Sequence, residues 1–233
     1  MSARYNILNK LKKADAYPMM EPDTDGYYQR NEMQWPDDIS RLKHWAAAMR
    51  AVKTEIFWVT EDTWPQTLRQ VAQEKGLRNM LLPLQTEHGQ KAKQALADTE
   101  IEARSFDRAI DTWKDEFFAE IDAGFTSSQC GIARTGTIML FSSPEEPRSL
   151  SLVPPVHFCL FDAAKMYNEF HHAVAGEQLV ENGMPTNVIL VSGPSKTADI
   201  QLTLAYGAHG PRDLVVLALL PAHLSPADLE DKA

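Results

Sequence analysis

Polar and turn-forming residues are concentrated in one stretch of the chain, residues 192–211, between the apolar runs 188–191 and 213–220. The stretch begins with SGPSKTAD and ends with GAHGP. Glycine lets a backbone approach a ligand closely, serine and threonine hydroxyls donate hydrogen bonds, and lysine adds a positive charge. These residues suit the binding of a carboxylate or a phosphate, although they would also suit a well-capped turn that holds no ligand.

The elements around this stretch are predicted to place it at one end of a parallel sheet. The run 188–191 is β-branched and apolar, as in a strand that is buried on both faces, and the second apolar run is predicted to be the next strand. Residues 197–206 are predicted to form a helix that Ser195 or Thr197 can cap. The loop 192–196 then joins the carboxyl end of a strand to a helix N-terminus, where open α/β sheets bind ligands and anions.

Lys196 and His209 are the candidate catalytic residues of this stretch. Histidine can act as an acid, a base or a hydrogen-bond donor near neutral pH, and a structural hydrogen bond is the alternative for His209. The loop is not a Walker A motif, because Ser195 stands where that motif needs a glycine, and the chain has no G-x-G-x-x-G motif. The predicted ligand-binding residues of the stretch are Ser192, Gly193, Ser195, Lys196, Thr197 and Asp199.

Two other stretches are predicted to contribute to the same pocket. Residues 131–140 have the pattern of a hairpin, and the side chains of Arg134 and Thr135 in its turn could lie at a pocket rim. A plain turn with glycine at its required position is the alternative. Arg148 precedes a run that leads into a Pro-Pro bend, and its guanidinium could bind a carboxylate through two hydrogen bonds or form a surface salt bridge.

The elements along the whole chain predict an α/β fold. Helical and strand patterns alternate from residue 37 onward, and strand patterns dominate between residues 128 and 162. This order predicts a three-layer α/β/α sandwich with a mostly parallel sheet and an antiparallel insert. We expect three regions: a helix and an aromatic-rich arm over 1–36, the main domain over 37–221 and a polar tail over 222–233.

Composition limits the classes of function. The net charge of -9 argues against non-specific binding to nucleic acid. We expect no membrane span, because no apolar run approaches the ~20 residues that one requires. No signal peptide is recognisable, so a cytoplasmic location is expected. Cys130 and Cys159 are expected to be buried thiols, and without a metal-ligand spacing we expect neither a metal nor a cofactor in this chain.

Three of these segments resemble the LUD domain of the lactate-utilisation protein C family, also called LutC or YkgG. They are IARTGTIML at 132–140, RSLSLVPPVH at 148–157 and SGPSKTADIQLTLAYGAHGP at 192–211, in the order and spacing of the family. The resemblance covers about residues 40–220, and the N-terminal segment NILNKL is also similar. It implies a fold like that of the NagB/RpiA/CoA-transferase group.

The resemblance also implies a role in the oxidation of L-lactate to pyruvate, beside partner proteins that carry iron–sulfur clusters. Members of the family usually have an acidic residue where this chain has Arg134. In CoA transferases of related fold a carboxylate forms the covalent intermediate, and an arginine cannot replace it as a nucleophile. An arginine here could bind a carboxylate or a phosphate instead.

Three functions are therefore compatible with the sequence. The first is a non-redox subunit of a lactate-oxidising system, which binds a small anion while its partners carry the electrons. The second is a free-standing enzyme of the CoA-transferase, isomerase or ligase-like group that acts on a phosphorylated or acyl substrate. The third is a sensor of an organic acid, whose sign would be stabilisation by a ligand without turnover.

Overall fold

The computed structural model describes residues 2–14, 20–198, 204–207 and 209–230, which form two compact units, Met1–Glu32 and Met33–Ala233. The first unit contains two helices, α1 (Ala3–Lys13) and α2 (Thr24–Asn31), and neither of them has a buried residue. The second unit contains all the strands described below. None of the helices in the described ranges is both long and apolar enough to cross a membrane.

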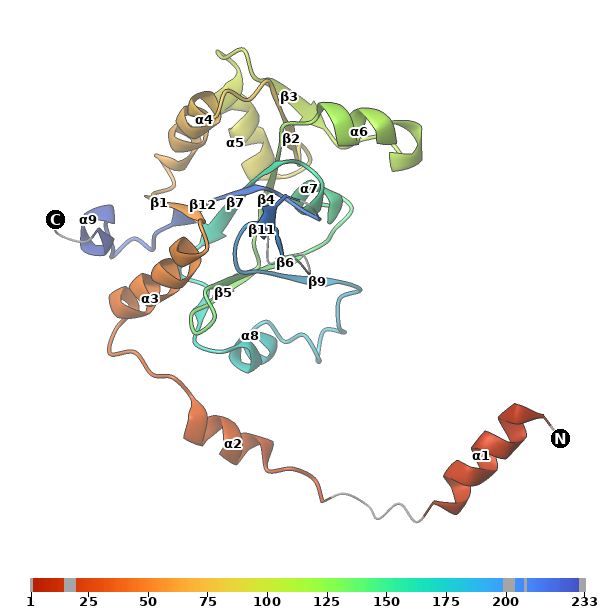
Figure 1. The fold of residues 1–233 in the computed structure, drawn as a ribbon. Coiled ribbons are helices and arrows are strands. Elements are labelled where there is room, and N and C mark those ends of the chain that lie inside the picture. The colour runs from red at the N-terminus through yellow and green to blue at the C-terminus, as the bar shows by residue number, and fades with distance from the viewer. Residues whose placement is uncertain (1, 15–19, 199–203, 208, 231–233) are drawn as a thin grey trace. The chain divides into compact units, whose positions relative to one another are not determined.

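Six parallel strands form the main sheet of the second unit (Figure 1). Their order across the sheet is β1 (Glu55–Val59), β12 (Asp213–Leu219), β7 (Val156–Asp162), β4 (Ala123–Ser127), β2 (Asn79–Leu82) and β3 (Glu102–Ser105). Strands β12 and β2 are apolar after their first residues, Asp213 and Asn79, as expected for strands of a sheet that is covered on both faces. The predicted mostly parallel sheet is confirmed.

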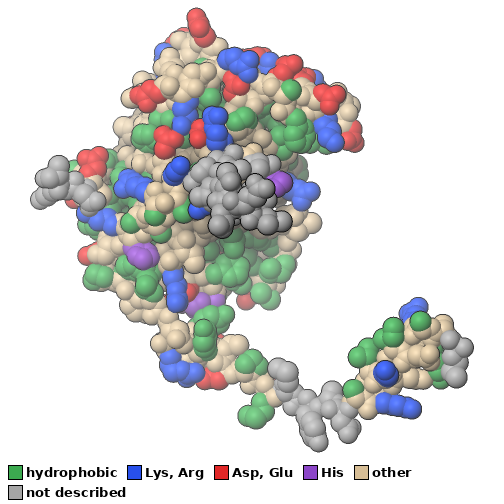
Figure 2. Space-filling model, viewed as in Figure 1, with side chains coloured by type: hydrophobic (Ala, Val, Ile, Leu, Met, Phe, Trp, Pro, Cys, Tyr) green, Lys and Arg blue, Asp and Glu red, His purple; other side chains and the backbone are tan. Residues whose placement is uncertain are grey.

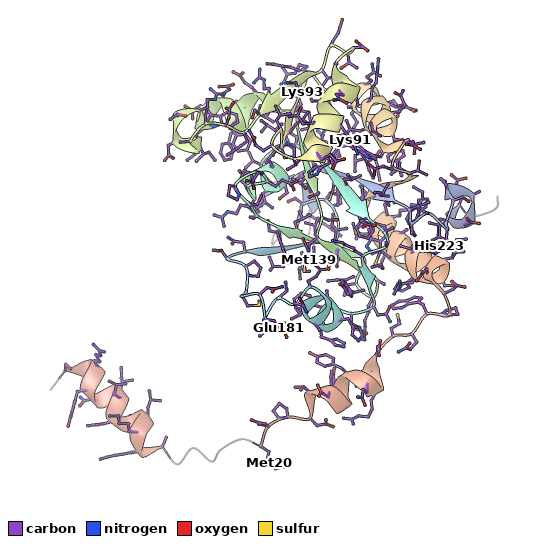
Figure 3. All side chains as sticks on the ribbon, turned by 180° about the vertical axis from the view of Figure 1, so that it is seen from behind. Met20, Lys91, Lys93, Met139, Glu181 and His223 are labelled. Carbon is purple, nitrogen blue, oxygen red and sulfur yellow. The ribbon has the colours of Figure 1, made fainter. Side chains whose placement is uncertain are left out.

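Two helices, α4 (Trp64–Glu74) and α5 (Glu87–Leu96), cover one face of the main sheet. Leu68 of α4 packs into the same cluster as Phe125 and Phe158 of the sheet. Helix α5 presents Lys91 and Lys93 away from the sheet, as Figure 3 shows. This face is thus a conventional helix-on-sheet layer.

The other face is covered by helix α3 (Asp38–Ala51) and by a second sheet. The order of the second sheet is β8 (Met166–Tyr167), β5 (Cys130–Ile132), β6 (Thr137–Phe141) and β9 (Val188–Val191), with antiparallel pairing on both sides of β6. Helix α8 (Phe170–Gly176) packs on its far face, where Ala173 joins Cys130 and Met139. The strand-rich segment 128–162 is therefore divided. Strands β5 and β6 pair antiparallel in a layer between the main sheet and α8, whereas β7 lies in the middle of the parallel main sheet and not in the insert where it was expected (Figure 1).

The remaining helices close the edges of the fold. The 3-10 helix Ile110–Thr112, α6 (Lys114–Glu120) and α7 (Ser149–Leu152) gather near β2, where Phe117 and Leu150 are buried together. Helix α9 (Pro226–Leu229) lies in the segment assigned to a polar tail, but Leu229 is only 2% exposed and joins the core around α3.

The prediction of a helix at residues 197–206 is wrong. Its described ends form two antiparallel strands, β10 (Lys196–Ala198) and β11 (Leu204–Tyr206), in which Thr197 lies opposite Ala205. Helix propensity is a weak preference, and strand pairing overrides it here because threonine, leucine and tyrosine also suit strands. Asp199 lies outside the described residues. Strand β9 pairs with β6 of the second sheet and not beside β12, so the expected strand–helix–strand unit does not form.

Candidate functional site

A cavity of about 190 Å³ lies beside the loop that follows β9. It is lined by Ser151, Leu152, His157, Ile189, Leu190, Val191, Ser192, Gly193, Pro194, Ser195, His209, Gly210, Pro211 and Leu214. Four of the predicted residues, Ser192, Gly193, Ser195 and His209, are therefore brought together. His157 and Leu214 lie near the amino ends of β7 and β12, so the cavity is not at the carboxyl edge of the main sheet, where it was expected.

Backbone hydrogen bonds hold the two loops of the cavity together. The Ser195 N–H donates to the carbonyl of Pro211 over 2.8 Å, and the Gly207 N–H donates to the carbonyl of Ser195 over 3.1 Å. Gly193 has a φ of +143°, and a β-carbon at this position would lie 2.6 Å from Cγ2 of Val52. Glycine is required there because the loop runs against the segment that follows α3.

A chain of hydroxyl groups links the predicted hairpin turn to the cavity. Thr135 Oγ1 lies 2.7 Å from Thr137 Oγ1, which lies 2.6 Å from Ser192 Oγ. The turn rests on α3, where Trp45 Nε1 donates to the Thr137 carbonyl over 3.1 Å. Thr135 is therefore coupled to the cavity through Thr137, although it does not line the cavity itself.

Three of the predicted residues, Arg134, Lys196 and Arg148, do not line the 190 Å³ cavity. Arg134 forms an ion pair with Glu169 over 2.7 Å, so its guanidinium already contacts a carboxylate of the chain. Lys196 is exposed and is not part of the cavity wall, and the backbone of Thr197 belongs to β10. Arg148 lines a second cavity, of about 10 Å³, which shares the wall residues Ser151 and Ile189 with the larger one.

His157 is the main wall residue that the sequence analysis did not assign to the site. Its side chain is buried, and its Nε2 lies 2.9 Å from Thr126 Oγ1. Burial lowers the pKa of this imidazole to about 3, so the ring is neutral at physiological pH. A single histidine in the apolar run 156–161 was the signal that could have identified it. Ser151 is also buried, and its hydroxyl donates to the Arg148 carbonyl over 3.0 Å.

The arrangement favours hydrogen bonding to a small and partly apolar molecule. Hydroxyl groups and imidazole rings contribute polar atoms, and Ile189, Leu190 and Leu214 contribute apolar surface. The volume is below the ~300–1,000 Å³ that is usual for drug-sized ligands. Figure 2 shows hydrophobic side chains gathered around the β6 and β9 region, whereas charged side chains of both signs lie over α4 to α6.

Both cysteines are buried thiols, as expected. Cys130 lies between the second sheet and α8, and Cys159 lies on β7 beneath the second sheet. Burial raises the pKa of each thiol to about 12, so both are protonated at neutral pH. Within the described residues, no group of three His, Cys, Asp or Glu side chains could hold a metal ion.

Comparison with known proteins shows which family the sequence matches and which solved structure has a similar fold. The LUD domain model matches residues 42–219. An uncharacterized protein of Neisseria meningitidis serogroup B is 72% identical over 233 residues, which are 100% of both chains. The lactate utilization protein C of Macrococcus caseolyticus is 26% identical over 170 residues, which are 69% of each chain.

Two further matches are more limited in length or identity. The lactate utilization protein C of Shouchella clausii is 38% identical over 96 residues, which are 40% of this chain and 42% of that protein. The crystal structure of a DUF162 family protein from Deinococcus radiodurans matches with a TM-score of 0.56 and 19% identity. That match covers 79% of this chain and 99% of the other, and it supports the fold alone.

Proposed function

This chain belongs to the LUD domain family, and we propose that it acts in lactate utilisation as a non-redox subunit of a system that oxidises L-lactate to pyruvate. The observation that carries the proposal is the match to proteins named lactate utilization protein C, which extends over 69% of the chain for the Macrococcus caseolyticus protein. The lactate-utilisation role rests on those names, and the subunit role is our own inference from the residues of this chain.

The non-redox part of the proposal rests on the cysteines. An iron–sulfur cluster normally needs about four thiolate ligands, and the chain has two cysteines. Both thiols are buried in separate clusters and stay protonated at neutral pH. The electrons of the reaction would therefore pass through clusters on partner proteins, and this chain would bind a small anion or help to assemble the complex.

The 190 Å³ cavity is the proposed site for that anion. Ser192, Ser195 and His209 can donate hydrogen bonds to a carboxylate, and the neutral His157 can hydrogen-bond to a hydroxyl group. The apolar wall suits a short carbon chain. The small volume does not favour a nucleotide or coenzyme A as the enclosed ligand, which weakens the case for a free-standing CoA-dependent enzyme.

Affinity purification from lactate-grown cells tests the subunit role. We expect iron–sulfur proteins to co-purify with the tagged chain in near-equal amounts, and we expect deletion of its gene to abolish growth on L-lactate. Purification of the chain alone, with normal growth of the deletion strain, would contradict the proposal. Stabilisation of the purified chain by organic acids, without co-purifying partners, would point to a sensor instead.

Complementation of the deletion strain tests the cavity separately. Ser192→Ala combined with His209→Ala removes two polar groups from the wall, and we expect this variant to restore growth poorly. His223→Ala is the matched control, because His223 is also an exposed histidine but lies beside Asp38, away from the cavity. Full growth with the double variant would show that the cavity is not the working site, even if the subunit role is correct.

A further inference from the structure

A second polar cluster lies at the carboxyl ends of β2 and β4, and none of its hydrogen-bonding residues lines the 190 Å³ cavity. These strands are parallel neighbours, with Met80 opposite Ala123. After β2 the chain continues into α5 on one face of the main sheet, whereas after β4 it enters β5 of the second sheet on the other face. Such a divergence between adjacent strands is where open α/β sheets bind ligands.

Three hydrogen-bond donors converge at this edge. Two of them belong to Ser127, the last residue of β4, through its backbone N–H and its hydroxyl. The third is Nε2 of His88, in the first turn of α5, which lies 3.1 Å from Thr86 Oγ1. The Thr86 hydroxyl donates its own hydrogen to the Pro83 carbonyl over 2.8 Å, so His88 Nε2 is the donor, and its single N–H is shared between Thr86 and the carboxylate oxygen that lies closer to it.

A carboxylate of the chain itself occupies the space between these donors. One oxygen of Glu146 accepts the Ser127 N–H over 2.9 Å, and the Ser127 hydroxyl lies 3.1 Å from both oxygens. The other oxygen lies 2.5 Å from His88 Nε2. Glu146 is only 8% exposed, and a buried carboxylate is costly unless donors surround it. The donors therefore form a cradle that is shaped for a carboxylate.

The segment that carries Glu146 has hydrogen bonds of its own that do not involve the cradle. Ser143 Oγ accepts the N–H groups of Glu145 and Glu146 over 3.2 and 2.9 Å, and the Ser143 N–H donates to the Glu146 carbonyl over 3.1 Å. Residues 143–145 are exposed. Withdrawal of the Glu146 side chain would therefore leave the local turn intact.

The cradle also has polar groups that Glu146 does not use. Glu146 and Ser127 line the 10 Å³ cavity together with Arg148 and Ser142. Within the described part of the chain, the buried hydroxyl of Ser142 has no hydrogen-bond partner. A hydroxyl without a partner is costly for a purely structural cluster, but it suits a cluster that also receives another ligand.

We propose that Ser127 and His88 form a binding site for a small external carboxylate, and that Glu146 occupies this site while the ligand is absent. The turn 142–147 then works as a plug that the ligand displaces. A tethered carboxylate competes at an effective concentration of millimolar order or higher, so the unmodified protein should bind a free carboxylate only weakly. Removal of the tethered carboxylate should expose the full affinity of the cradle.

Titration of the full-length protein with acetate, followed by calorimetry, tests this proposal. We expect Glu146→Ala to bind acetate at least tenfold more tightly than the unmodified protein. Glu145→Ala is the matched control, because Glu145 is the exposed neighbour in the same turn, and its affinity should be unchanged. Glu146→Ser is the second variant if the alanine variant does not fold, because its short polar side chain vacates the cradle as alanine does.

Two further variants locate the bound acetate. In the Glu146→Ala background, Ser127→Ala should weaken acetate binding at least tenfold, whereas Ser192→Ala in the 190 Å³ cavity should not change it. Binding lost with Ser192→Ala alone would place the acetate in the larger cavity and overturn the proposal. Folded Glu146→Ala or Glu146→Ser protein that binds acetate no better than chloride at equal ionic strength, or that binds only phosphate, would overturn it as well.

Discussion

Lowering the pH should destabilise the fold through His157. The pKa of this buried imidazole is about 3 in the native state, against about 6.5 in an unfolded chain. Below pH 6.5 the unfolded chain therefore binds a proton that the native state excludes, and stability is lost as the pH falls towards 3. One pH unit corresponds to about 1.4 kcal/mol, so a change from pH 7 to pH 5 should cost about 2 kcal/mol from this residue alone.

Urea unfolding at both pH values, followed by tryptophan fluorescence, measures this loss. In the His157→Gln variant we expect the loss between pH 7 and pH 5 to be smaller by about 2 kcal/mol, whatever the stability of the variant at pH 7. Leu214→Ala is the control, because Leu214 is buried in the wall of the same cavity but carries no titratable group, and its loss should equal that of the unmodified protein. An equal loss in all three proteins would refute the assignment of a neutral, buried His157.

Two other substitution or labelling experiments follow from the packing. Gly136→Ala should lower the free energy of unfolding by roughly 2–4 kcal/mol, because Gly136 has a φ of +57° and a β-carbon there would lie 2.6 Å from Ala48 Cβ. Ala48→Gly in the same chain should recover part of that loss, and chemical denaturation of the double variant checks it. Cys130 and Cys159 should not react with a thiol-specific disulfide reagent in the native protein, and both should react after unfolding, because both are buried. Rapid labelling of the native protein would contradict their burial.

The sequence alone was sufficient for the class of the fold. The apolar run that became β12 was predicted to be a strand, and the alternation of helical and strand patterns from residue 37 onward indicated a mostly parallel sheet that helices cover. The start of α3 has a local cause of the same kind, since Asp37 accepts the Ser40 N–H over 2.7 Å and aspartate is one of the residues preferred at an N-cap. These features depend on local patterns of residue type, which a single sequence displays directly.

Local sequence patterns did not predict which distant segments pair as strands. The segment 197–206 carries residues that suit a helix or a strand, and the pairing of β10 with β11 decided between them. Strand β9 has the apolar run of a central parallel strand, yet it pairs with β6 in the second sheet. Local propensities differ by about 1 kcal/mol or less per residue, so long-range contacts determine the outcome.

The candidate site also contains some residues that the sequence identified and others that only the tertiary structure identified. Residue types and loop spacing identified Ser192, Gly193, Ser195 and His209, because small, hydroxyl-bearing and imidazole side chains in turns are recognisable without a structure. His157 and the Glu146 cradle came only from the tertiary structure. A histidine in an apolar strand and a glutamate in a polar turn have no distinctive spacing, and their environments are created by segments far away in the chain. The sequence thus determined which groups were present, and burial and long-range hydrogen bonds decided which of them face a common cavity.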